Sequence, residues 1–172
     1  MKKALFILLS VMFMLPLAMR AQVLPDYSFT AVSGGTYTAL DASLTTALSL
    51  GDDAYEQVTL PFNFRFGENW YTTISVCSNG YLSLGSTSNS TSPSFTSTSV
   101  SSISPLGHDL TPNDGGTVSY ATEGTTPNRV FTVQWAGVPA YNSSNTYEFQ
   151  VKLYETTNAI EFCYGNINII DS

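Results

Sequence analysis

The sequence predicts an all-β protein, an antiparallel two-sheet β-sandwich, and three observations support this fold class. At least seven short segments alternate apolar with polar side chains and follow one another about every ten residues. Turn-forming Asn, Asp and Gly residues separate these segments. Aromatic residues make up 13% of the 172 residues and charged residues only 11%, a balance typical of an extracellular β protein rather than of a disordered acidic chain.

The first two strands are expected in residues 61–66 and 71–78. A phenylalanine stands at every second position of the first segment, so one face of that strand is apolar. In the second segment Ile74 and Val76 share one face, and Cys77 lies on the opposite, polar face. Both segments therefore predict strands that are buried on one side.

Tight turns connect the next segments. Asn79-Gly80 precedes residues 81–85, and Asn-Gly between alternating runs is a strong hairpin signal because both residues tolerate a positive φ. Residues 114–116, Asp-Gly-Gly, give a similar turn before the strand expected at 117–120.

Three further strands are expected in the second half, at residues 129–135, 147–153 and 160–164, with a turn at 156–158. Full burial of each apolar side chain contributes about 1.5–3 kcal/mol. The expected core consists of Phe62, Phe64, Phe66, Ile74, Val76, Phe131, Val133, Trp135, Phe149, Val151, Phe162 and Tyr164.

Two segments do not follow the strand pattern. Residues 39–50 space their apolar side chains roughly as a helix does, but Thr45 and Thr46 weaken a helix, so a strand pair or an irregular segment is the alternative. Residues 86–102 contain 13 Ser or Thr among 17 positions and predict a long surface loop.

The N-terminus predicts a secretory signal peptide, residues 1–21. Two lysines precede a largely apolar run, and small residues end at Ala21. The run is short for a membrane span, and no later segment approaches the ~20 apolar residues that a span needs. Residues 22–172 are therefore expected to form one secreted domain, and the short signal peptide with two lysines favours a bacterial source.

Charge excludes some partners. Once residues 1–21 are removed, three basic residues remain against all 13 acidic residues, a net charge of −10. This balance argues against nucleic acid and against anionic membrane surfaces.

Four segments resemble the nidogen-like extracellular β domain, in the same order along the chain. They are residues 61–67 (PFNFRFG), 78–85 (SNGYLSLG), 115–120 (GGTVSY) and 130–135 (VFTVQW). The resemblance spans about residues 58–165 and implies a module of adhesive matrix or bacterial surface proteins, whose partner is an extracellular protein or a glycan. Relatives usually continue past this point, so the resemblance also predicts that the chain is C-terminally truncated and that its last sheet has an unpaired edge.

Catalysis is not expected. His108 is the only histidine and stands beside Asp109, but adjacent residues on a loop do not easily form an Asp-to-imidazole hydrogen bond. The chain also has no Gly-x-Ser-x-Gly element. We expect no enzymatic activity and no obligatory cofactor.

Asp109 and Asp114 are the candidate metal ligands. They lie with Asn113 in one turn-rich loop, and calcium binds six to eight such oxygen ligands. The alternative is that Asp114 serves only the turn. Asp52 and Asp53 form a weaker candidate of the same kind.

Cys77 and Cys163 are the only cysteines, and in an exported protein they predict one disulfide. The alternative is two free thiols on strands that do not meet.

Trp70, Tyr71 and Tyr141 are candidate sugar-binding aromatics, because a flat ring beside polar residues can stack on a sugar. The sequence therefore predicts a secreted, non-enzymatic adhesive or structural surface module, with a carbohydrate-binding module as the alternative.

Overall fold

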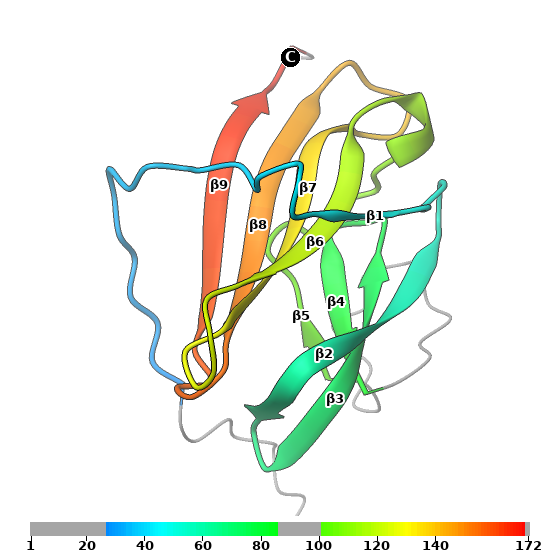
Figure 1. Ribbon diagram of the computed structural model, residues 1–172. Helices are drawn as coiled ribbons and strands as arrows, with labels where there is room; N and C mark the ends of the chain where they lie inside the picture. Colours follow the sequence, from blue (N-terminus) through cyan, green and yellow to red (C-terminus); the bar gives the residue numbers. More distant parts are fainter. Residues whose placement is uncertain (1–26, 86–100, 171–172) are drawn as a thin grey trace, which may run out of the picture.

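A computed structural model of the chain describes residues 27–85 and 101–170, and within them it forms two antiparallel sheets, as predicted (Figure 1). The expected signal peptide and most of the Ser/Thr-rich segment lie outside the described residues. The five-stranded sheet has the order β1-β6-β7-β8-β9, and the four-stranded sheet has the order β2-β3-β4-β5. The strands are β1 Thr46–Leu48, β2 Tyr55–Phe66, β3 Asn69–Cys77, β4 Tyr81–Leu84, β5 Ser102–Ile103, β6 Thr117–Glu123, β7 Val130–Pro139, β8 Thr146–Tyr154 and β9 Ile160–Asn168, and one 3₁₀ turn, η1, spans Pro112–Asp114.

The chain visits the two sheets in a simple order. It starts in β1, forms β2 to β5 as one meander, and returns to add β6 to β9 beside β1. The candidate helix at residues 39–50 is absent, because this segment enters β1 and pairs with β6. The β-branched Thr45 and Thr46 favour an extended backbone there.

The apolar core lies between the sheets and is built as the alternation predicts. The expected core residues are buried except for three: Phe66 is partly buried, and Phe162 and Tyr164 are exposed. The rings of Trp135 and Phe149 stack at 4.9 Å, and the Trp135 indole Nε1 donates a 3.2 Å hydrogen bond to the Cys77 carbonyl of the opposite sheet. This bond joins the two sheets directly.

Two local features of the four-stranded sheet follow from residue chemistry. The register of β2 against β3 shifts between Thr59 and Phe64, around Pro61, because proline has no N–H to donate to a regular ladder. The β3–β4 turn is a three-residue loop in which Gly80 alone has a positive φ, +75°, and not the two-residue turn that Asn79-Gly80 suggested. A Cβ at Gly80 would lie 3.1 Å from the Phe149 ring.

Candidate functional site

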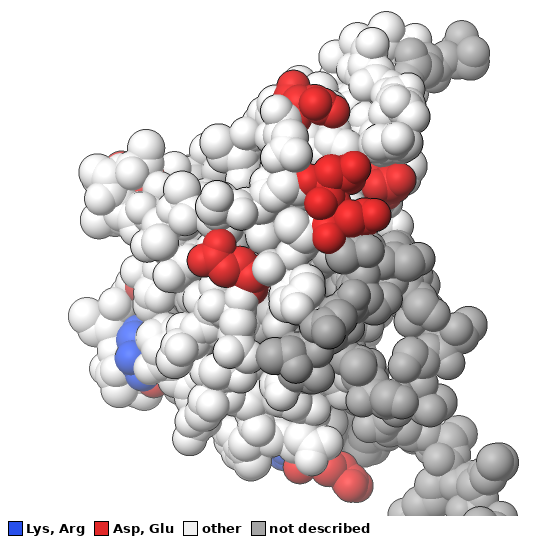
Figure 2. Space-filling view, turned by 90° about the vertical axis from the view of Figure 1, so that its right-hand side faces the viewer, with Lys and Arg blue, Asp and Glu red and all other residues white. Residues whose placement is uncertain are grey.

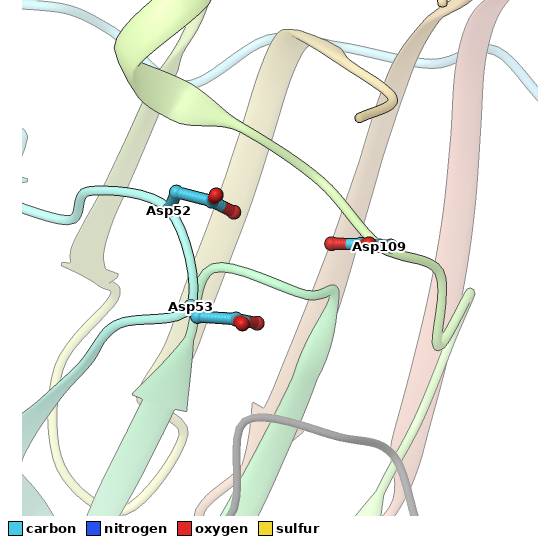
Figure 3. A group of neighbouring side chains, drawn as sticks. All are labelled: Asp52, Asp53 and Asp109. Atoms are coloured by element: carbon cyan, nitrogen blue, oxygen red, sulfur yellow. The ribbon is translucent and has the colours of Figure 1, made fainter. Parts of the chain in front are cut away.

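Three aspartates from two distant segments meet at one end of the sandwich. Asp52 and Asp53 lie in the loop between β1 and β2, and Asp109 lies between β5 and η1. One carboxylate oxygen from each lies within 4.8 Å of the others, and all three residues are exposed. Figure 2 shows acidic side chains gathered on one face, and in Figure 3 the carboxylates of Asp52 and Asp53 point toward Asp109. We call these three residues the Asp triplet.

The buried Asn79 side chain connects the two segments of the Asp triplet. Its Nδ2 donates a 2.8 Å hydrogen bond to Asp53 Oδ1, and its Oδ1 accepts a 3.0 Å bond from the backbone N–H of Leu110. Next to it, the Ser78 hydroxyl accepts a 3.0 Å bond from the Ala54 N–H. The β3–β4 turn therefore fixes the spacing of the acidic loops.

The oxygen donors of the Asp triplet suit a hard divalent cation. Calcium takes oxygen ligands at about 2.3–2.6 Å, so ligands on opposite sides of the ion stand about 5 Å apart. The observed 4.8 Å limit lies within that separation. Three carboxylates supply at most six ligand atoms, and backbone carbonyls or water complete such a site. Without a cation, three close carboxylates repel one another.

The structure therefore groups Asp109 with Asp52 and Asp53, and this group does not include Asp114. Asp114 is the last residue of η1 and its backbone N–H donates to the Thr111 carbonyl, which is a turn role. More than 50 positions separate Asp53 from Asp109, so only the strand pairing could have revealed that they meet. The hairpin signal at Asn79 was visible in the sequence, but its connecting role was not.

The three candidate sugar-binding aromatics do not form one surface. Trp70 is 62% exposed and lies opposite Arg65 on the β2–β3 hairpin. Tyr71 packs over Gly85, where a Cβ would lie 2.6 Å from its ring, and its hydroxyl donates to Ser101. Tyr141 is 51% exposed, in the β7–β8 loop at the other end of the sandwich (Figure 1). Trp70 is thus the candidate best placed for an external ligand.

A cavity of about 280 Å³, lined by both polar and apolar residues, lies beside the β2–β3 hairpin. Arg65 and Gly67 line it from the β2–β3 hairpin, and Thr157 and Asn158 line it from the β8–β9 turn. Asn158 Oδ1 accepts a 2.8 Å hydrogen bond from the Arg65 backbone N–H, which joins the two hairpins. This bond fixes part of the cavity wall, and Arg65 in that wall is the strand partner of the exposed Trp70.

His108 is exposed and packs edge-on against the Tyr147 ring at 5.5 Å. Its neighbour Asp109 belongs to the Asp triplet. The neighbours of His108 are thus an aromatic ring against which it packs and a member of the acidic cluster.

The predicted disulfide is not formed, and both cysteines are free. Cys77 ends β3 of the four-stranded sheet, whereas Cys163 lies on β9 of the other sheet, so the two strands never pair. Cys77 was expected on an outward face, yet it is 2% exposed, and burial raises the pKa of its thiol. The Cys163 thiol donates to Glu161 Oε1 at 3.3 Å, and burial together with this carboxylate raises its pKa.

No helix within residues 27–85 and 101–170 has the length and apolar character to cross a membrane.

The two antiparallel sheets define the class of protein, a β-sandwich module, and its loops carry the Asp triplet. A family model described as NIDO related matches residues 26–171, and the chain belongs to this family. This match confirms the resemblance to nidogen-like domains and indicates an extracellular module. No curated protein and no solved structure gives a significant match to the chain.

Proposed function

We propose that the chain is an exported, non-enzymatic module with an adhesive or structural role at a cell surface. The family match over residues 26–171 carries this proposal, because it indicates an extracellular module. The acidic character of the chain supports a protein or glycan partner rather than a nucleic acid.

Export is tested by expressing the full chain in a bacterial host and sequencing the N-terminus of the product outside the cytoplasm. We expect Gln22 as the first residue, because the small residues before it suit signal peptidase. A product that keeps Met1 and stays in the cytoplasm would refute export.

Adhesion is tested with beads that display the purified domain. The beads are allowed to settle on glass coated with collagen or mucin and are then exposed to flow. We expect them to resist detachment from at least one coating more strongly than beads that carry albumin. If the domain beads detach from both coatings as easily as the albumin beads do, the adhesive role is contradicted and the structural role remains.

We propose that calcium binds at the Asp triplet and stabilises the loops that carry it. A cation there removes the repulsion among three carboxylates, and a ligand that binds only the folded state raises its stability, by about 2.7 kcal/mol at 100 times Kd. Calcium should therefore raise the unfolding temperature of the wild-type chain but not of Asp109→Asn. Asp114→Asn is the matched control, because it removes an exposed carboxylate outside the triplet. A calcium response that survives in Asp109→Asn would exclude this site.

The alternative function is a carbohydrate-binding module, which is supported by the exposure of Trp70 opposite Arg65, a residue that lines the cavity. The wild-type domain is applied to a glycan array together with Trp70→Ala and Tyr141→Ala. Binding lost only in Trp70→Ala would favour this function over the adhesive protein module, and binding unchanged in both variants would exclude Trp70. Hydrolysis of any bound glycan that disappears in His108→Ala would contradict the non-enzymatic assignment.

A further inference from the structure

The last strand of the five-stranded sheet has an uncovered apolar side. Phe162 and Tyr164 face the same way as their β8 partners Val151 and Phe149, which are fully buried. Yet Phe162 is 39% and Tyr164 is 47% exposed. The four-stranded sheet thus covers β8 but only part of β9. Ile167, Ile169 and Ile170 are also exposed, near the end of the described chain.

Apart from a bulge at residues 165–166, β9 lacks the features that protect sheet edges from pairing. Edge strands are usually short, or carry lysine, proline or inward-pointing charges. The other edges of the two sheets follow this rule, because β1 and β5 have three and two residues and β2 contains Pro61. In contrast, β9 has nine residues, no proline and no lysine. Its single charged side chain, Glu161, points to the outer face, where Tyr154 and Cys163 donate hydrogen bonds to it.

The hydrogen-bond phase of β9 fixes which residues can pair with a further strand. The Tyr154 N–H donates to the Ala159 carbonyl at 3.1 Å, so Glu161 and Cys163 direct their backbone groups toward β8. Phe162 and Tyr164 then direct theirs toward the open edge, since successive residues alternate. The open edge thus offers backbone donors and acceptors next to two exposed aromatic rings.

We propose that a second copy of this chain pairs with this edge, β9 against β9 in antiparallel orientation, with the two-fold axis at Cys163. In this register each Phe162 lies opposite Tyr164 of the second copy, which places four aromatic rings side by side, and Glu161 lies opposite glycine. A register centred on Glu161 would oppose two carboxylates, which destabilises a strand pair. The five-stranded sheets of the two copies would then join into one continuous sheet of ten strands.

Charge is compatible with pairing at this edge, and the exposed area sets the strength of the dimer. The chain carries a net charge of −7, so two copies repel through most of their surfaces, and acidic residues gather on another face (Figure 2). Only one carboxylate lies on β9, so two copies can meet at this edge with little electrostatic repulsion between the paired strands. An aromatic side chain has roughly 150–250 Å² of surface, so the exposed aromatic and isoleucine atoms amount to some 400 Å² per copy, which is less than a standard interface buries and limits the dimer to a weak, reversible one.

Sedimentation equilibrium of the reduced domain tests the dimer directly. We expect the wild-type mass to rise from monomer toward dimer between about 1 μM and 1 mM, the range of a weak complex. Phe162→Lys places a charge on the pairing surface and should raise the dissociation constant at least tenfold. Leu44→Lys is the matched control, because Leu44 is 62% exposed and lies outside both sheets, and it should dimerise as the wild type does. Circular dichroism of each variant confirms that the fold is kept.

Cys163 supplies a second measurement, which also tests the register. Residues that are opposite each other and not hydrogen-bonded have Cα atoms about 4.5 Å apart, within the range of a disulfide. Air oxidation with a copper catalyst should therefore link two chains: each thiol loses a proton and an electron, one S–S bond forms, and oxygen is reduced. The linked dimer should revert with reductant and be absent in Cys163→Ser.

A wild-type mass that stays monomeric over the whole range would overturn the proposal. So would a folded Phe162→Lys variant that dimerises as tightly as the wild type, or a dimer that oxidation does not link through Cys163. None of these outcomes bears on export or calcium binding, so the proposal fails or stands independently of the proposed function.

Discussion

The two faces of the five-stranded sheet are both buried at their centres, but by different means. The inner face packs Val133, Trp135 and Val151 against the opposite sheet and is apolar at its centre. The outer face carries Gln134 and Gln150, which are also buried. In Figure 1 the N-terminal segment, in blue, crosses this outer face before it enters β1. The centre of one face is thus covered by a sheet and the centre of the other by a single extended segment.

The outer face is held by hydrogen bonds that converge on one oxygen. Gln134 Oε1 accepts from the Tyr37 hydroxyl at 3.1 Å, from the Leu40 N–H at 2.9 Å and from Gln150 Nε2 at 2.7 Å. Gln150 Nε2 also donates to the Thr38 carbonyl at 2.9 Å. We call residues 37–40 the strap. The comparison teaches that alternation identifies the two sides of a strand but not whether the polar side meets water.

The largest effect is expected on the inner face. Trp135→Ala removes a fully buried ring that stacks on Phe149 and bonds to the opposite sheet, so it should cost about 3–5 kcal/mol of unfolding free energy. Urea denaturation at neutral pH measures this loss. A loss below about 1 kcal/mol would mean that the two sheets do not depend on this contact.

A smaller effect is expected on the outer face. Gln134→Ala leaves three donors without their shared acceptor and should cost about 1–3 kcal/mol. It should also speed amide exchange at Leu40, whose N–H loses its acceptor. Gln57→Ala, an exposed glutamine on β2, is the matched control for stability. If both variants unfold alike and Leu40 stays protected, the strap does not depend on Gln134.

Tyr37→Phe removes one of the three bonds and should cost about 0.5–1.5 kcal/mol. The wild-type chain should in addition lose stability more steeply with alkali than the variant does. Burial raises the pKa of the Tyr37 hydroxyl above its usual value, so the folded state favours the protonated form. That contribution is complete below the unfolded pKa of about 10 and declines as the pH rises above it. Thermal unfolding of both proteins from pH 8 to 11 measures it, and parallel curves would contradict a raised pKa at the part-buried Tyr37.

The fold was predictable because it depends on local patterns. Alternation located the strands around Phe64, Trp135 and Val151, and glycine-containing turns placed two of the connections. The sandwich could therefore be predicted before any strand pairing was known. The strand edges were less predictable, because the extent of β9 and the exposure of Phe162 depend on how far the opposite sheet reaches.

The candidate site was predicted only in part. Asp109 was identified from its loop composition, but its partners Asp52 and Asp53 are close to it only because Asn79 joins the two segments. The disulfide prediction was wrong for a related reason. Facing the polar side of a strand does not bring Cys77 and Cys163 together when their strands belong to different sheets.

The smallest effect on stability is expected at the cysteines, whose accessibility tests how much of the outer face is covered. Cys163 shares the outer face with Gln150, its partner on β8, but it is only half-buried. Its thiol should therefore react with a disulfide reagent in the native chain, whereas Cys77 should react only after unfolding, because burial both shields it and raises its pKa. Cys163→Ser should change the unfolding free energy by less than about 0.5 kcal/mol. One rapidly labelled thiol per native chain is expected. If neither thiol reacts until a reductant is added, the two cysteines are paired and the separation of the two sheets at these strands is wrong.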